Sequence, residues 1–326
     1  MRQILRLGTR SSLLAQAQAR LAQSALKSLL DDSSVELFPM RTTGDARQGT
    51  SDACIPDKQM WVRELEEALL RSDIDIAIHS AKDVPIEISP GTCLLPILGR
   101  NFPEDVFVHR NFTLLNQLAD EQNSIQSLPF GAMVGTASAR RRAELLRYRP
   151  DLQIVETRGN VTTRLRKLEE EPTLMGIVIA RAGIERLELS IEYQVLPCSM
   201  LLPAMNQGIL LAQYRQGDAL IEASLKALVE PAVYAAWQAE RECIRSLAAD
   251  CHSAVAVYGE TRKLDSKDAP INNSVKNGEL KLAARVLSAD GARCLEATLV
   301  GVWSQALDMG QTVAEMLKAQ GADGLL

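Results

Sequence analysis

Basic residues recur directly after the strand-like segments of the first two hundred residues. They are Arg10, Lys82, Arg140, Arg141, Arg142, Arg158, Arg164 and Arg186. In open α/β sheets, ligands bind beyond the carboxyl ends of the strands, where helix N-termini offer free N–H groups. A guanidinium at such a position can hold a carboxylate in a bidentate pair, whereas a single arginine could equally be a solvated surface residue. Five or six of them at equivalent strand ends predict a site for a multivalent anion.

Asp83 is a carboxylate within this basic set. It follows an apolar segment, lies beside Lys82, and precedes the rigid Val84-Pro85 step. A carboxylate among cations stays ionised, so it could stabilise a developing positive charge or shuttle a proton. It could also be a structural aspartate that caps a turn, and spacing alone favours that simpler interpretation.

Cys251 lies in a loop that follows a long helical segment, with His252 beside it. A cysteine in such a place is more often inert than reactive, but the loop position and the histidine make a modest case for a nucleophilic thiol. The six cysteines form no C-x-x-C pair, and the chain has only three histidines. We therefore expect free thiols and no metal site.

The elements that would position these residues alternate between strand and helix, which is typical of parallel α/β units. The expected strands cover 4–7, 35–41, 73–80, 132–135, 152–156 and 174–180, and the expected helices cover 13–30, 61–70, 139–147 and 161–170. The openings Gly8-Thr9-Arg10-Ser11 and Gly135-Thr136-Ala137-Ser138 are alike. This suggests two similar α/β domains, although four small residues match easily by chance.

The last third of the chain has a different pattern. A long helix over 231–248 precedes expected strands over 254–258, 280–287 and 295–300, the last two joined by a hairpin at Ala289-Asp290-Gly291. A helix over 312–319 closes the chain, and 265–278 is a polar loop. We expect a separate α+β domain here.

Composition and charge exclude several classes of protein. The chain has 326 residues, of which 46% are hydrophobic and 24% charged, so two or three ordinary globular domains are expected. Aromatic residues at 4% and a net charge of -5 argue against a nucleic-acid partner. There is no P-loop or G-x-G-x-x-G motif, no membrane-spanning apolar stretch and no signal pattern at the N-terminus. We expect a cytoplasmic protein with no membrane partner.

Together these segments resemble the porphobilinogen deaminase (hydroxymethylbilane synthase) family, from Leu5 to about Leu317. The strongest match is 77–85, which is similar to the family segment H-S-x-K-D-x-P. Four more segments match in the family's order, at 9–15, 135–141, 158–165 and 202–208. Five motifs in order are far more specific than any one alone.

The resemblance implies an α/β fold with two similar domains like those of type 2 periplasmic binding proteins, plus a small C-terminal α+β domain. The expected division places the active-site aspartate in domain 1, the arginine cluster in domain 2 and the cofactor cysteine in domain 3. The corresponding ranges are 1–100 with 200–217, 101–199 and 218–326.

It also implies a transferase of tetrapyrrole and haem biosynthesis. The family's cofactor is a dipyrromethane built from the substrate and held by a thioether, one per chain, here at Cys251. Porphobilinogen loses ammonia, and the free α-carbon of the terminal pyrrole attacks the resulting azafulvene. Four additions and a hydrolysis release linear hydroxymethylbilane. The expected partner is the small molecule porphobilinogen, and the chain is expected to be a monomer.

The resemblance assigns roles to individual residues. Asp83 and Lys82 match the catalytic positions, and Asp83 would stabilise positive charge near the pyrrole nitrogens. The cofactor-binding positions are Cys251, Ser12, Lys82, Asp83, Ser138, Arg140, Arg141 and Arg158. The substrate-binding positions are Arg10, Gln18, Arg158, Arg164 and Arg186. Lys58 and Trp61 match the basic and aromatic residues of a loop that covers the site.

Three segments depart from the family pattern. The loop 53–60 contains Pro56 and no glycine, which should stiffen it, and Asp250 precedes Cys251, which should raise the pKa of the thiol. Asn206 stands where the family has glycine. Two alternatives stay open. One is a two-lobed anion-binding protein, which would share the arginines at the strand ends, and the other is a degenerate deaminase homologue with low activity, which these departures make possible.

Overall fold

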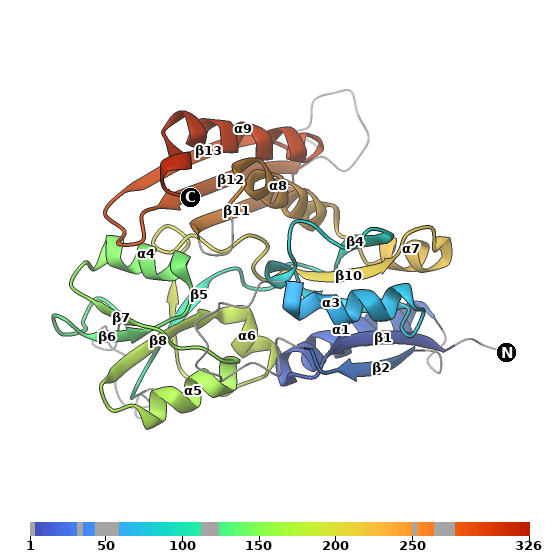
Figure 1. The fold of residues 1–326 in the computed structure, drawn as a ribbon, viewed down its shortest axis with the longest axis horizontal. Coiled ribbons are helices and arrows are strands. Elements are labelled where there is room, and N and C mark those ends of the chain that lie inside the picture. The colour runs from blue at the N-terminus through green and yellow to red at the C-terminus, as the bar shows by residue number, and fades with distance from the viewer. Residues whose placement is uncertain (1–3, 31–34, 43–58, 112–123, 250–252, 264–277) are drawn as a thin grey trace.

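Three β-sheets organise the chain (Figure 1). The structure is a computed structural model that describes residues 4–30, 35–42, 59–111, 124–249, 253–263 and 278–326, with only the backbone of 59–61. Two sheets have five strands each and lie side by side, and a third sheet of three strands lies across both of them. No helix in these ranges is long and apolar enough to cross a membrane.

The first sheet has the strand order β2-β1-β3-β10-β4. Its strands are β1 (Leu5–Arg10), β2 (Val35–Met40), β3 (Ile76–Ser80), β4 (Thr92–Ile97) and β10 (Leu210–Arg215). The helices beside it are α1 (Leu13–Leu29), α3 (Gln59–Leu70) and α7 (Ala219–Lys226). β1 pairs in parallel with β2 and β3, whereas β10 runs antiparallel to β3 and β4.

The second sheet has the order β7-β6-β8-β5-β9. Its strands are β5 (Asp105–His109), β6 (Met133–Gly135), β7 (Gln153–Val155), β8 (Leu174–Ala180) and β9 (Gln194–Leu196), and its helices are α4 (Ala139–Tyr148), α5 (Val161–Glu170) and α6 (Arg181–Arg186). β6 pairs in parallel with β7 and β8, and β5 runs antiparallel to β8 and β9.

The two five-stranded sheets therefore share one topology, which confirms the expectation of two similar α/β units. Both sheets are mixed, because one antiparallel strand lies fourth in each, and the alternation of strands and helices in the sequence does not reveal that strand. The chain crosses from the first sheet to the second between β4 and β5 and returns between β9 and β10. The first strand after each crossing, β5 in the second sheet and β10 in the first, is the antiparallel strand of its sheet.

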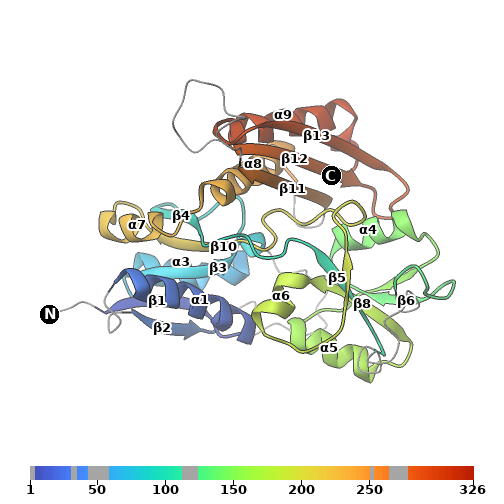
Figure 2. The same cartoon turned by 180° about the vertical axis from the view of Figure 1, so that it is seen from behind.

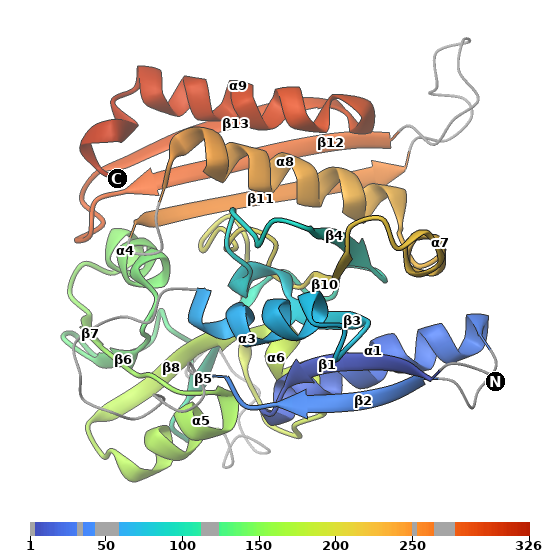
Figure 3. The same ribbon diagram turned by 45° about the vertical axis from the view of Figure 1, so that its right-hand side comes forward.

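The third sheet is antiparallel, in the order β11-β12-β13. Its strands are β11 (Ala254–Lys263), β12 (Gly278–Leu287) and β13 (Cys294–Val302), and its long helices are α8 (Pro231–Leu247) and α9 (Ala306–Ala319). Both helices pack on the same face of the sheet (Figure 3). The core between them holds Ala239, Cys243, Val257, Leu282 and Val313, all buried. This arrangement is the α+β unit expected for the last third.

The division into three domains stays a proposal, with one change. α7 packs against β4 and β10, and its Leu225 lies in the core of the first sheet. We therefore place α7 with the first domain and begin the third domain near Glu230 instead of at 218. The domains built on the first and second sheets form two lobes. The third domain contacts both of these lobes, through α8 and β11 (Figure 2).

Candidate active site

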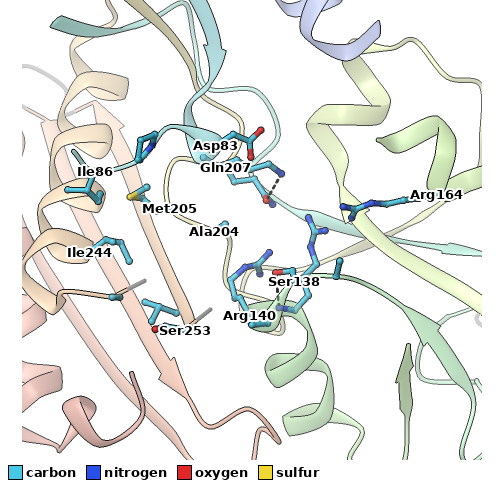
Figure 4. Close-up of a pocket in the computed structure, with 17 residues that line it drawn as sticks. Asp83, Ile86, Ser138, Arg140, Arg164, Ala204, Met205, Gln207, Ile244 and Ser253 are labelled. Atoms are coloured by element: carbon cyan, nitrogen blue, oxygen red, sulfur yellow. Dashed lines mark hydrogen bonds between the residues drawn. The ribbon is translucent and has the colours of Figure 1, made fainter. Parts of the chain in front are cut away.

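A cavity of about 510 Å³ opens where the two lobes meet the third domain (Figure 4). Its charged and polar wall is formed by Lys82, Asp83, Ser138, Arg140, Arg141, Arg164 and Gln207. Met205, Ile244 and Val255 form an apolar wall. The volume is within the usual range for small-molecule sites, and a mixed lining of this kind suits a ring system that carries charged substituents.

A short 3-10 turn places Lys82 and Asp83 at this cavity. It spans Ala81–Asp83 and directly follows β3. Ala81 and Val84, on either side of the pair, are buried in a small apolar cluster, and the Ala81 N–H donates to the carbonyl of Ile209 at 3.0 Å. Because both flanking residues are held in the core, the charged pair between them faces the cavity.

Lys82 is a buried cation whose pKa is lowered toward neutral pH. Its Nζ donates to Gln207 Oε1 at 3.3 Å. Burial, with repulsion from Arg141, lowers the pKa of Lys82 to about 8, although Asp83 and Asp105 oppose the shift. The ammonium therefore remains mostly protonated at neutral pH.

Arg140 and Arg141 enter the cavity from the first turn of α4. Ser138 caps this helix, and its Oγ accepts the backbone N–H of Arg141. Both guanidinium groups are buried and bind one carboxylate, because Arg140 Nη2 lies 2.6 Å from Asp105 Oδ2 and Arg141 Nη2 lies 2.8 Å from Asp105 Oδ1. Burial alone would raise the pKa of Asp105, but the two guanidiniums outweigh it and hold that pKa well below its usual range.

Gln207 connects the two charged groups. Its Nε2 donates to Asp105 Oδ1 at 2.7 Å and to the Pro103 carbonyl at 2.7 Å, while its Oε1 accepts from Lys82. The sequence did not indicate the role of Asp105. The signal available was an acidic residue placed directly before the apolar run Val106-Phe107-Val108.

Arg164 extends into the cavity from α5, on the side facing Asp83 (Figure 4). Asn160 caps this helix by accepting the Thr163 N–H at 2.9 Å, and Arg164 Nε donates to the Gly159 carbonyl at 2.7 Å. Burial, with Arg141 nearby, lowers the pKa of Arg164 to about 10, and Asp83 opposes this. The guanidinium is therefore still charged at neutral pH.

Asp83 also lines a second, smaller cavity of about 50 Å³. Two of the residues expected to bind substrate, Arg10 and Gln18, lie at this cavity, whereas a third, Arg164, lines the large one. The other polar residues that line the smaller cavity include Ser12 and His79. Ser12 caps α1 by accepting the Ala15 N–H at 3.3 Å. Burial lowers the pKa of His79 to about 4, so this imidazole is neutral at physiological pH. Asp83 thus lies at the junction of the two cavities.

The large cavity keeps an excess of positive charge. Lys82, Arg140, Arg141 and Arg164 outnumber the two carboxylates, Asp83 and Asp105. A ligand with several carboxylates would complete this balance. Among the described residues, His, Cys, Asp and Glu form no group that could hold a metal ion.

Two of the arginines assigned to cofactor or substrate binding, Arg158 and Arg186, lie outside both cavities. Arg158 Nε binds Glu156 Oε1 at 2.5 Å on the surface. Arg186 Nη2 donates to the Gly208 carbonyl at 2.6 Å, and burial lowers the pKa of this guanidinium to about 10. Each guanidinium has further N–H donors beside these bonds, so a ligand contact by either side chain stays a prediction.

Three expected residues cannot be placed as side chains. Lys58 and Cys251 lie outside the described residues, and Trp61 is described only as backbone within α3. Ala249 and Ser253, the described residues on either side of Cys251, both line the large cavity.

Asn206 occupies a position that favours glycine. Its φ is 59°, in the left-handed region, which asparagine tolerates better than most residues. Its backbone N–H donates to Glu240 Oε2 at 2.5 Å, and the residue is fully buried. Asparagine therefore adopts here a left-handed conformation that glycine would adopt without strain.

Comparison with known proteins identifies the family. Residues 5–223 match the family model described as porphobilinogen deaminase, dipyrromethane cofactor binding domain, and residues 234–319 match the model of its C-terminal domain. A porphobilinogen deaminase of Syntrophomonas wolfei is 36% identical, covering 99% of this chain and 97% of that protein. One of Syntrophotalea carbinolica is 38% identical, with 99% and 95% covered.

Solved structures show a weaker likeness. An ancestral cationic amino acid solute-binding protein matches with a TM-score of 0.40 and 16% identity, over 70% of this chain and 89% of that one. The fold class follows from the three sheets themselves. The family models and the curated relatives decide the assignment. The chain belongs to the porphobilinogen deaminase family.

Proposed function

We propose that this chain is a hydroxymethylbilane synthase, which condenses four porphobilinogen molecules with loss of ammonia and releases linear hydroxymethylbilane by hydrolysis. The observation that carries the proposal is the position of Asp83 at the junction of two cavities, one rich in cations and the other lined by Arg10, Ser12 and Gln18. The family assignment favours this activity over a two-lobed anion-binding protein and over a degenerate homologue.

The residues of the large cavity fit a dipyrromethane. Such a group carries two acetates and two propionates, and four cations line the cavity. The Nε atoms of Arg140 and Arg141 are buried and have no acceptor among the described residues, so each guanidinium retains a donor. The apolar wall of Met205, Ile244 and Val255 suits the pyrrole rings. When bound, the cofactor supplies the nucleophilic α-carbon of its terminal pyrrole.

Cys251 is our proposed point of attachment, through a thioether. Support comes from its neighbours, because Ala249 and Ser253 both line the cavity. α8 ends at Leu247 and Ala248 adopts a left-handed φ of 53°, so the chain turns off the helix directly before this segment.

Asp83 is our proposed catalytic carboxylate. Porphobilinogen would bind on the side of the smaller cavity, where Arg10 can hold a substrate carboxylate and Gln18 offers hydrogen bonds. The Asp83 carboxylate would then stabilise the positive charge that develops at a pyrrole nitrogen. His79 is neutral and cannot compete for that carboxylate as a cation. Lys82 would hold a carboxylate beside Gln207.

The remaining assignments follow from the family and the composition. We propose a transferase that acts as a cytoplasmic monomer, with porphobilinogen as its partner and with neither nucleic acid nor membrane. The net charge of -5 supports the absence of a nucleic-acid partner.

Intact-protein mass spectrometry tests this function. The purified chain should carry the added mass of two pyrrole units, and porphobilinogen should add further units. Cys251→Ser should remove the added mass, whereas the matched control Cys294→Ser, at a half-buried cysteine of β13, should keep it. A wild-type chain without added mass that binds porphobilinogen unchanged would favour the anion-binding alternative. Added mass that persists in Cys251→Ser would refute the attachment site.

A further inference from the structure

Arg241 connects the third domain to the loop that follows Asp83. It lies on α8, and its Nη2 donates to the carbonyls of Pro85 at 3.0 Å and Ile86 at 2.7 Å. Pro85 and Ile86 line the large cavity, whereas Arg241 is not among its lining residues. The guanidinium therefore holds a wall of the site from behind.

The surroundings of Arg241 keep it charged and fixed. Burial lowers the pKa of its guanidinium to about 10, and Glu87 opposes this shift, so the group is a cation at neutral pH. The guanidinium carbon lies 5.8 Å from the centre of the Trp237 ring, within reach of a cation–π contact. Trp237 itself packs against the apolar cluster that contains Ala81 and Val84.

The segment from Ala81 to Ser89 is anchored at both ends by other groups. The Ala81 N–H donates to the Ile209 carbonyl, and Ser89 donates to Glu66 through both its backbone N–H and its Oγ. Arg241 bonds to the stretch between these anchors, two and three residues after Asp83. Its removal would leave the anchors in place and loosen the part of the loop next to the carboxylate.

We propose that Arg241 is a positioning residue for Asp83. This inference rests on the proposed function, because it assumes that the Asp83 carboxylate acts on the reacting pyrrole. α8 carries Arg241 near its middle and ends four residues before Cys251. One rigid helix therefore sets both the start of the cofactor-attachment segment and the loop that bears the catalytic carboxylate.

The effect should appear in the rate and not in binding. A carboxylate that stabilises charge in the transition state acts over a short distance, so a small displacement lowers turnover. The proposed substrate-holding groups, Arg10 and Gln18, line the smaller cavity, whereas Arg241 bonds to the loop that forms a wall of the large cavity. Loss of the hydrogen bonds from Arg241 to the loop should therefore lower kcat and leave KM nearly unchanged.

The test compares Arg241→Gln and Arg241→Lys with Arg245→Gln as a matched control. Arg245 lies one turn further along α8, is 59% exposed, and pairs with Glu242 at 2.6 Å. We expect kcat for porphobilinogen to fall about tenfold in Arg241→Gln, with KM within about twofold of wild type. Arg241→Lys keeps the charge and should recover part of the rate, and Arg245→Gln should match wild type.

Amide hydrogen exchange supplies a readout that needs no activity. Peptides covering 82–88 should exchange faster in Arg241→Gln than in wild type, and should be unchanged in Arg245→Gln. Unchanged exchange would overturn the proposal, as would a kcat within twofold of wild type or a loss of rate in Arg245→Gln as large as that in Arg241→Gln. If Arg241→Gln does not fold, Arg241→Lys carries the same comparison. A wild-type chain without bound pyrroles would instead refute the proposed function. The exchange data would still test whether Arg241 holds the loop at Pro85 and Ile86 in place.

Discussion

Asp105 is the residue whose replacement tests the charge balance of the site most directly. Asp105→Asn keeps the size of the side chain and removes its negative charge. The carboxylate is fully buried and accepts from Arg140 at 2.6 Å, from Arg141 at 2.8 Å and from Gln207 at 2.7 Å. An asparagine can accept through only one atom, and its NH₂ group would face donors.

The expected loss of stability follows from this burial. Removing one partner of a buried ion pair destabilises a protein by about 3 to 5 kcal/mol, because the other charge is left uncompensated. Here two guanidiniums lose their shared partner, while the near-equal volume of asparagine keeps the packing contribution small. We therefore expect the free energy of unfolding to fall by about 3 to 5 kcal/mol, a large part of the stability of an ordinary domain.

The pH dependence has a definite sign. The pKa of Asp105 lies well below its usual range in the folded chain, so its stabilising effect is present above the unfolded pKa and is lost only as pH falls through the folded value. The difference between wild type and Asp105→Asn should thus persist at neutral and mildly acidic pH and shrink only at strongly acidic pH.

Urea denaturation in a Cys251→Ser background, which removes any contribution from the cofactor, provides the measurement. Asp73→Asn is the matched control, because Asp73 pairs with Arg71 at 2.9 Å while 58% exposed. Exposed pairs contribute about 0 to 1 kcal/mol, so this variant should stay close to the parent. If Asp105→Asn loses no more stability than Asp73→Asn, the reasoning that Asp105 compensates Arg140 and Arg141 is refuted.

Two further replacements address the reaction and the domain contact. Asp83→Asn should fold and bind porphobilinogen with a modestly altered KM, but its turnover should be about 10²-fold slower. Asp83→Glu keeps the charge and should retain more activity. Wild-type turnover in Asp83→Asn loaded with cofactor would show that Asp83 has only a structural role. Glu144, beside Arg285 at 3.4 Å, has its pKa raised from 4.5 to about 7 by burial, so the folded chain holds a proton there that the unfolded chain releases. The contribution of Glu144 to stability should therefore fall as pH rises from about 4.5 to 7, whereas that of His79, whose pKa burial lowers to about 4, should rise over much of the same window. Glu144→Gln removes only the first contribution, so stability should rise more steeply with pH in its melting curves than in those of wild type; equal slopes in both proteins would contradict this.

Local patterns in the sequence predicted many elements to within a few residues. The helix over 161–170 and the strand over 174–180 coincide with α5 and β8, because a cap or a continuous apolar run marks their ends. α9 begins six residues before the expected 312, at Ala306. Gly310 weakens the helical pattern there, but a Cβ at this position would lie 2.6 Å from the Ala239 carbonyl of α8. The close approach of two helices, which sequence alone does not show, favours glycine within the helix.

The residues of the site likewise fall into those that local sequence predicts and those that it does not. Lys82, Asp83, Ser138, Arg140, Arg141 and Arg164 reach one cavity because each follows a strand or opens a helix, a rule that reads directly from sequence. The groups that connect them depend on contacts between distant segments. Gln207 meets Asp105 across 102 residues, and Arg241 meets Pro85 across 156. Neither pairing has a local signal.

These long-range contacts change what the arginines can do. From sequence, Arg140 and Arg141 are free cations for a ligand, but in the structure they share Asp105, so part of their charge is already balanced. The remaining positive charge rests more heavily on Lys82 and Arg164, whose pKa values burial lowers to about 8 and about 10. A carboxylate that enters the cavity raises both values again, because it favours the charged forms. The fold thus holds two arginines in place with an internal carboxylate. The four cations of the cavity still exceed the carboxylates Asp83 and Asp105 by two charges, which suits the binding of an acidic ligand.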